Sequence, residues 1–276
     1  MRIRLAHSPD PDDAFMFYGL ACGAVDAGPY RFEHVLEDIQ TLNERARRGE
    51  FEVTAISIHA YPYVRERYQL TSCGSSMGDN YGPMVVARAP LKIEDLRGRT
   101  IAVPGLMTTA FLTLELLLGR GAFTPQVVMF DEIPDAVADG HVDAGLLIHE
   151  GQLTYPKFGL HLVVDLGQWW MERTGLPLPL GGNAVRRDLG PEHCRAITDI
   201  VRATIRYGLE HRAEAVAYAL QFGRGLDTGL ADRFVGMYVN EWTLDYGPRG
   251  REAVQRLLTE GAAAGLVPDC GTIDFL

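Results

Sequence analysis

The sequence has no long hydrophobic run and no excess of positive charge, and each absence excludes a class of protein. The longest purely apolar runs are short, such as residues 144–148, whereas about 18–20 apolar residues are needed to span a bilayer. Lysine and arginine together number 26 against 36 aspartates and glutamates, which gives a net charge of −10. A general nucleic-acid binder needs a basic face. We therefore expect neither a membrane nor a nucleic acid as a partner.

Closely spaced cysteines and a secretion signal are also missing. The four cysteines, at positions 22, 73, 194 and 270, form no CxxC pair, which favours reduced thiols in a cytosolic protein. The first seven residues, MRIRLAH, alternate between charged and apolar side chains like a strand. They lack the apolar core of a signal peptide, so we expect a cytoplasmic location.

The common nucleotide and hydrolase motifs are absent as well. The chain contains no GxGxxG, no GxxxxGK[ST] and no GxSxG, so nucleotide binding and serine-hydrolase chemistry lack support. The eight histidines show no metal-ligand spacing, and we expect no metal site. Nothing in the sequence predicts an oligomeric state.

What the sequence does contain is an alternation of strand and helix signals. From residue 191 onward the pattern becomes mainly helical. Strands that alternate with helices of 8–12 residues indicate an α/β fold with mostly parallel sheets. The predicted strands cover residues 2–7, 30–35, 53–58, 84–87, 100–103, 126–129 and 144–148.

The order of these elements predicts two lobes within the 276 residues. Residues 89–181 form a small α/β lobe inserted into a larger one, which consists of residues 1–88 and 182–276. Ligands of two-lobed proteins usually bind between the lobes. We therefore expect a cleft there, reached by polar residues that directly follow strands.

Hydroxyl side chains stand at or after the ends of two of the predicted strands and open helices there. These are Ser57 and the pair Thr108 and Thr109. The free N–H groups at a helix N-terminus bind carboxylates well. The alternative is that these hydroxyls only cap their own helices.

Three further segments supply candidates for the cleft. His149 ends an apolar strand, where an imidazole can act as a base near neutral pH or serve as a structural hydrogen-bonding group. Ser8, Asp10 and Asp13 lie in the turn after the first strand, where helix capping is the alternative. Asn80 belongs to a turn-rich loop that is either a lid or a surface connection.

Several strings resemble the 1,4-dihydroxy-6-naphthoate synthase family of the futalosine pathway of menaquinone biosynthesis. The resemblance extends over nearly the whole chain, and the strings around positions 149 and 175 are specific. It is carried by HSPDPDDAFMFY (7–18), LEDIQTLN (36–43), IAVPG (101–105), GLLIHE (145–150) and GLPLPLG (175–181).

This resemblance implies a two-lobed fold like that of type 2 periplasmic binding proteins, with the ligand cleft between the lobes. It implies a lyase that cleaves a carbon–carbon bond of cyclic dehypoxanthine futalosine, a small-molecule carboxylate, without a cofactor. The family's proton acceptor matches His149. Its substrate contacts match Ala55, Ile56 and Ser57 and the pair Thr108 and Thr109.

The chain departs from the family pattern in two places. The family's first turn reads more often SPCPNDTF, whereas Asp10, Asp12 and Ala14 stand here, and the apolar Leu106 and Met107 precede the threonine pair. Two other functions stay open at this point. One is a non-catalytic solute-binding or sensor protein, and the other is the sister enzyme of the pathway, a chorismate dehydratase.

Overall fold

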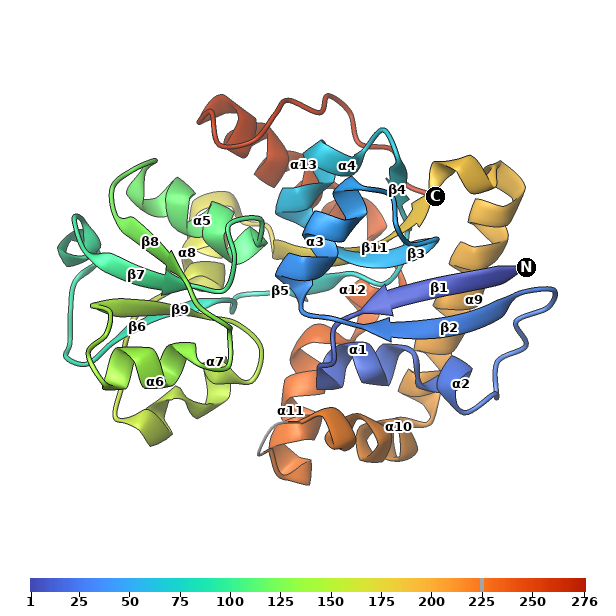
Figure 1. Ribbon diagram of the computed structural model, residues 1–276, viewed down its shortest axis with the longest axis horizontal. Coiled ribbons are helices and arrows are strands. Elements are labelled where there is room, and N and C mark those ends of the chain that lie inside the picture. Colours follow the sequence, from blue (N-terminus) through green and yellow to red (C-terminus); the bar gives the residue numbers. More distant parts are fainter. Residues whose placement is uncertain (224–225) are drawn as a thin grey trace.

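The computed structural model describes residues 1–223 and 226–276, which form two lobes that lie side by side (Figure 1). The outer lobe holds both chain termini and the sheet made by β1–β5 and β11. The inserted lobe holds the sheet made by β6–β10. Within the described residues, no helix combines the length and the apolar character needed to cross a membrane.

The outer sheet has the strand order β2-β1-β3-β11-β4, and β5 pairs with β11. β1 is parallel to β2 and to β3, whereas β11 runs antiparallel to its neighbours. All five residues of β3 are buried, as expected for an apolar central strand. The strands are β1 (Arg2–His7), β2 (Arg31–Leu36), β3 (Val53–Ser57), β4 (Tyr68–Leu70), β5 (Ser76–Gly78) and β11 (Leu178–Arg186).

The sheet of the inserted lobe has the order β10-β6-β9-β7-β8. β7 is parallel to β8 and β9, but β6 is antiparallel to β9 and β10. The strands are β6 (Met84–Ala87), β7 (Thr100–Val103), β8 (Thr124–Val127), β9 (Ala144–Leu147) and β10 (His161–Asp165).

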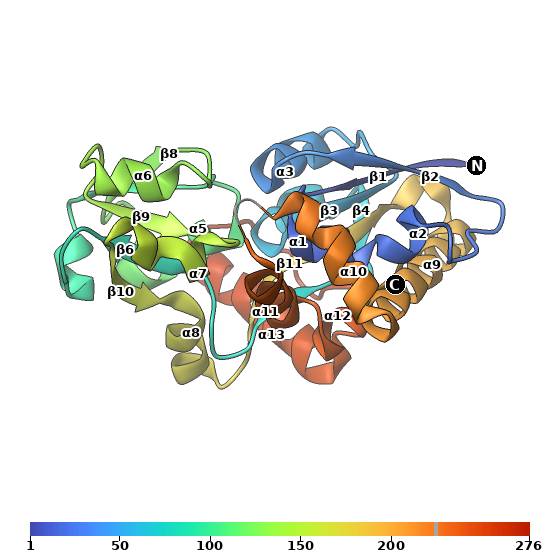
Figure 2. The ribbon, with the colours of Figure 1, turned by 90° about the horizontal axis from the view of Figure 1, so that it is seen from below.

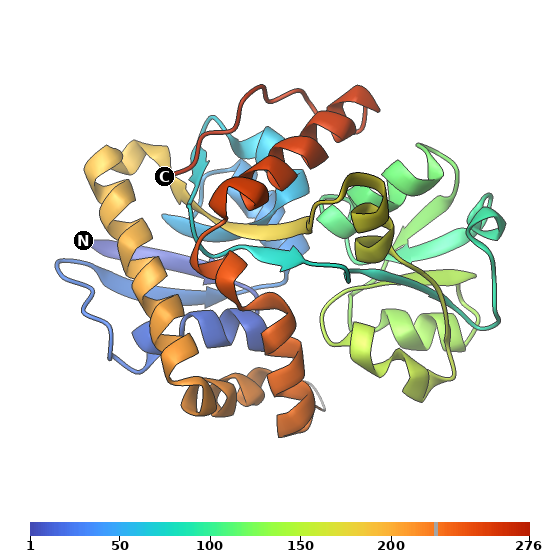
Figure 3. The same ribbon diagram turned by 180° about the vertical axis from the view of Figure 1, so that it is seen from behind.

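Both sheets are mixed, but β11 in the outer sheet and β6 in the inserted sheet each run against all the other strands of their sheet, so the expectation of mostly parallel sheets is confirmed apart from these two strands. β6 and β11 follow the two places where the chain crosses between the lobes (Figure 3). A strand that enters from the other lobe begins near the carboxyl ends of the parallel strands of its new sheet. It must therefore run antiparallel to them.

The change of sheet differs slightly from the boundaries expected from the sequence. The chain leaves the outer sheet after Gly78 and enters the inserted one at Met84, and it returns between Asp165 and Leu178. The sequence placed these changes after residues 88 and 181. Turn signals mark where a strand ends, but only its pairing partners decide to which lobe the strand belongs.

Helices surround both sheets, and the C-terminal helices cover the outer lobe on one side (Figure 2). α3 illustrates how the local sequence sets their ends. The Asp38 carboxylate caps it by accepting from the Thr41 N–H, and Gly49, with a φ of 70°, directly follows the C-terminal cap residue Arg48. The helices are α1 (Pro11–Met16), α2 (Tyr18–Ala21), α3 (Ile39–Arg47), α4 (Tyr61–Val64), α5 (Thr109–Leu118), α6 (Ile133–Ala138), α7 (Gly151–Thr154), α8 (Leu166–Thr174), α9 (Pro191–Glu210), α10 (Arg212–Ala219), α11 (Thr228–Tyr238), α12 (Glu241–Leu244) and α13 (Gly247–Ala263).

The two lobes share one hydrophobic cluster on one side of the boundary between them. It includes Leu112 of α5 in the inserted lobe and Leu257 of α13 in the outer lobe, both fully buried. A separate cluster, which includes the fully buried Phe15, holds α1 against α9, α10 and α11. Each side of the cleft is therefore supported by closely packed elements.

Candidate active site

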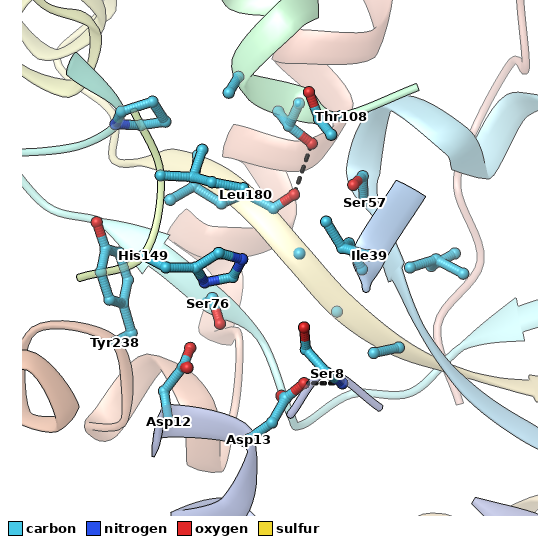
Figure 4. Close-up of a pocket in the computed structure, with 18 of the residues that line it drawn as sticks. Ser8, Asp12, Asp13, Ile39, Ser57, Ser76, Thr108, His149, Leu180 and Tyr238 are labelled. Atoms are coloured by element: carbon cyan, nitrogen blue, oxygen red, sulfur yellow. Dashed lines mark hydrogen bonds between the residues drawn. The ribbon is translucent and has the colours of Figure 1, made fainter. Parts of the chain in front are cut away.

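A cavity with about 750 Å³ of empty space, part of it open to solvent, lies between the lobes. Its walls come from the ends of β1, β3 and β9, from the start of α5 and from the middle of β11 (Figure 4). The structure brings eight of the residues singled out from the sequence to this cavity: Ser8, Asp13, Ala55, Ile56, Ser57, Thr108, Thr109 and His149.

His149 follows β9 and lines the cavity from the inserted lobe. Its φ of 51° is in the left-handed region, which non-glycine residues seldom adopt and which is over-represented at functional sites. The ring packs edge-on against Phe130, with centroids 4.9 Å apart. Its Nε2 lies 3.4 Å from Oδ2 of Asp10, whose side chain is fully buried in the outer lobe. Groups from both lobes thus position the imidazole.

Asp10 itself does not line the cavity but lies behind His149. The expected alternative for this turn, helix capping, is not what the carboxylates do. Asp10 precedes α1 without a side-chain cap, and the Asp13 carboxylate accepts the backbone N–H of Ser8 at 2.7 Å.

Burial changes the protonation of the two acids in this turn that line the cavity. It raises the pKa of Asp12 to about 8, and repulsion from Asp13 adds to the effect. Burial also raises the pKa of Asp13 to about 7, although the hydrogen bond from Ser8 opposes this. At neutral pH the carboxyl groups of Asp12 and Asp13 therefore stay at least partly protonated, and a protonated carboxyl group can donate a hydrogen bond.

Ser57 lies on the outer lobe at the end of β3 and is held by one asparagine. Asn43 Nδ2 donates to Ser57 Oγ at 2.9 Å, and the Ser57 N–H donates to Asn43 Oδ1 at 2.8 Å. The hydroxyl proton of Ser57 is then available for a ligand. The helix expected after Ser57 is only a 3₁₀ turn, Ile58–Ala60, followed by the short α4, and Ser57 does not cap it. Any ligand contact of Ser57 therefore rests on its hydroxyl.

Thr108 and Thr109 use their hydroxyl groups within the protein. Thr108 Oγ1 donates to the Gly105 carbonyl at 2.9 Å and accepts from the Phe111 N–H, which caps α5. Thr109 Oγ1 donates to the Leu180 carbonyl at 2.5 Å. What α5 offers the cavity is its first turn, where helix geometry leaves N–H groups without intrahelical acceptors. A carboxylate fits such a position.

Replacing Thr108 by alanine removes this cap, and we expect the free energy of unfolding to fall by about 1 kcal/mol. Urea denaturation of both proteins measures the difference. The exposed Thr228 at the first turn of α11 provides the matched control, because Thr228→Ala removes a helix-terminal hydroxyl that does not cap. Equal losses in the two variants would contradict the role of Thr108.

Asn80 does not line the cavity. It is exposed and has a φ of 65°. The turn-rich loop that contains it is part of the connection between β5 and β6. The sequence signal came from the turn itself, which asparagine and glycine make regardless of function.

The sequence reasoning missed several lining residues: Asp12, Ser76, Gln152, Asn183 and Tyr238. Tyr238 Oη of α11 donates to Gln152 Oε1 of α7 at 2.7 Å, a contact between the lobes. Both side chains come from helices, so they are not among the residues at strand ends that the sequence pattern indicates. Asn183 sits just beyond the GLPLPLG string, so only its neighbourhood gave a signal.

The arrangement favours proton transfer on an anionic ligand. One imidazole faces the cavity, and N–H and hydroxyl donors stand where a carboxylate or a developing oxyanion can be bound. Among the described residues, no group of three or more histidine, cysteine, aspartate or glutamate side chains is placed to hold a metal ion.

Comparison with known proteins identifies close relatives. Residues 3–263 match a family model described as menaquinone biosynthesis. A 1,4-dihydroxy-6-naphthoate synthase of Thermus thermophilus is 46% identical over 96% of this chain and 95% of its own length. The Streptomyces coelicolor enzyme of the same name is 41% identical over 98% and 96%.

Solved structures confirm the predicted fold. A crystal structure of an Archaeoglobus fulgidus protein is 48% identical, covers 96% of this chain and 98% of its own, and superposes with a TM-score of 0.92. A Candida albicans protein with the generic periplasmic-binding-protein fold is 14% identical and covers 98% and 92%, with a TM-score of 0.74. The second likeness concerns the fold alone.

Proposed function

The chain belongs to the menaquinone-biosynthesis family, and from this premise we propose that it is a 1,4-dihydroxy-6-naphthoate synthase. Its substrate in this proposal is cyclic dehypoxanthine futalosine, and His149 is the base. The observation that carries the proposal is the place of His149, whose ring lines the cavity between the lobes while Nε2 faces the buried Asp10.

The reaction starts when the neutral imidazole of His149 accepts a hydroxyl proton from the sugar-derived part of the substrate. The oxygen then forms a carbonyl group, and the adjacent carbon–carbon bond breaks. The bonding electron pair moves into the ring system on its way to aromaticity. No electrons leave the substrate, so the step needs no redox cofactor.

The remaining residues bind the substrate and stabilise charge. The N–H groups in the first turn of α5 and the Ser57 hydroxyl hold the carboxylate or the developing oxyanion. Ala55 and Ile56 supply apolar surface beside them. The protein has a net charge of −10, so these local donors have to outweigh a weak long-range repulsion of an anionic substrate.

The product assay tests this proposal directly. Purified protein is incubated with cyclic dehypoxanthine futalosine, and mass spectrometry is expected to detect 1,4-dihydroxy-6-naphthoate. A parallel incubation with chorismate is expected to give no dehydration product, and the opposite pattern would identify a chorismate dehydratase. Binding of the futalosine derivative without turnover would instead identify a solute-binding protein.

A further inference from the structure

Four buried polar atoms of residues that line the cavity have no hydrogen-bond partner within the described part of the chain: Asn183 Oδ1, His149 Nε2, Ser8 Oγ and Asp12 Oδ1. The last two, Ser8 Oγ and Asp12 Oδ1, belong to residues that are close in the sequence and more than nine-tenths buried. Buried polar groups almost always have partners, and leaving one without a partner costs free energy. A bound ligand with hydroxyl groups would supply the missing contacts.

These two atoms lie on one side of His149, whereas Ser57 and Thr108 lie on the other (Figure 4). The cavity therefore has two polar ends with different chemistry. The end near Ser8 carries the carboxyl groups of Asp12 and Asp13. The opposite end offers hydroxyl and N–H donors at Ser57 and at the start of α5.

We propose that Ser8 and Asp12 bind the hydroxyl groups of the sugar-derived part of the substrate and so set its orientation in the cavity. The inference rests on the proposed function and extends it. The substrate carboxylate then occupies the Ser57 end, and the bond to be broken lies beside His149.

Charge decides between the two orientations. A substrate carboxylate placed against Asp12 and Asp13 would be repelled by any negative charge they carry, in a buried setting where repulsion is strong. Hydroxyl groups suffer no such repulsion, since they donate to a carboxylate and accept from a protonated carboxyl group. The orientation also brings a hydroxyl group to the base, as the proposed reaction requires.

The product provides a sharp test, because 1,4-dihydroxy-6-naphthoate lacks the sugar-derived fragment. Binding of intact substrate is measured by calorimetry in the His149→Ala background, with and without Ser8→Ala. Binding of the product is measured in otherwise wild-type protein, again with and without Ser8→Ala. We expect Ser8→Ala to weaken substrate binding about three- to tenfold, the loss of one hydrogen bond, and to leave product binding unchanged.

Two further variants complete the comparison. Ser57→Ala is expected to weaken the binding of both substrate and product, because both molecules carry the carboxylate. Asn80→Gly changes a residue that does not line the cavity and is expected to leave the affinities for both substrate and product unchanged. If Ser8→Ala weakens product binding as much as substrate binding, or leaves both unchanged, the proposed orientation is wrong.

The failure of this inference can be told from failure of the proposed function. If wild-type protein forms the product while Ser8→Ala leaves substrate affinity intact, the orientation fails and the function stands. If wild-type protein forms no 1,4-dihydroxy-6-naphthoate from the futalosine derivative, both proposals fail. Asp12→Asn gives a second reading of the orientation, since an amide can still donate to and accept from a hydroxyl group, and we expect it to bind substrate within about threefold of the wild type.

Discussion

Replacing His149 by alanine is expected to lower kcat for 1,4-dihydroxy-6-naphthoate formation by about 10²–10⁴-fold, the usual contribution of a positioned general base. The alternative acceptors near the substrate are poor. Asp12 and Asp13 hold their protons more tightly than ordinary carboxyl groups, because burial raises the pKa of both. Substrate binding should change far less than kcat, since in the proposed orientation the carboxylate lies at the Ser57 end of the cavity.

The variant should fold, which keeps the experiment interpretable. The left-handed backbone at position 149 is already adopted by a residue with a Cβ atom, and alanine adds no atom beyond that Cβ. The alanine side chain therefore fits in the space that the imidazole occupies. Circular dichroism and thermal unfolding check this point. His149→Asn serves as the control, because asparagine accepts a positive φ but cannot act as a base near neutral pH. Turnover close to that of the wild type in a folded His149→Ala protein would refute the assignment.

The sequence could locate His149 and Ser57 because Ser57 ends, and His149 closely follows, a short and fully buried strand. Apolar runs bounded by polar residues mark such strands clearly, and the ends of parallel strands meet at one edge of a sheet. The structure confirms that β3 and β9 both end at the cavity. This part of the site is thus encoded locally, in the pattern of a few residues.

β11 is a central strand that the local sequence pattern does not predict. Its segment holds Pro179 and the pair Gly181 and Gly182, residues that normally argue against a central strand. In the structure it pairs with β3 on one side and with β4 and β5 on the other. The register shifts between Pro179 and Gly181, so an irregularity absorbs the unfavourable residues. Tertiary pairing overrides propensity here.

Tyr238 lines the cavity although no local sequence pattern indicates it. It lies on α11, far along the chain from any strand of the inserted lobe, and reaches the cavity only because α1, α10 and α11 pack together. Its hydrogen bond with Gln152 of α7 links the lobes. Residues of this kind become visible only when helix packing is known, since nothing in their own neighbourhood distinguishes them from core positions.

The buried acids predict a second large effect, in which stability depends on pH through Asp12. The native pKa of Asp12 is raised to about 8 from its usual 3.8, mainly by burial. Below pH 3.8 both the native and the unfolded chain bind the proton. Between these two values the native state keeps the proton and the unfolded state loses it. The contribution of Asp12 to stability is therefore present below pH 3.8 and is lost as pH rises through about 8.

Asp12→Asn removes this titration, so we compare the variant with the wild type at each pH. The unfolding free energy of the variant relative to the wild type is expected to rise with pH by about 1.4 kcal/mol per unit between pH 5 and 7. Urea denaturation at pH 5, 6, 7 and 8 measures it. The difference cancels the opposite contribution of His7, whose pKa burial lowers to about 3, because both proteins contain that residue.

Repulsion between Asp12 and Asp13 couples the two titrations, so the rise belongs to the pair and not to one carboxyl group alone. Asp13→Asn should for that reason show a rise of the same sign that levels off earlier, since the raised pKa of Asp13 is about 7. Asp139→Asn is the matched control, because the Asp139 side chain is exposed and stays in water in both states. A flat difference for Asp12→Asn would show that Asp12 is ionised in the native cavity, and no protonated carboxyl group would then be present at this position. An equal slope for Asp139→Asn would show that the pH dependence does not come from the burial of Asp12.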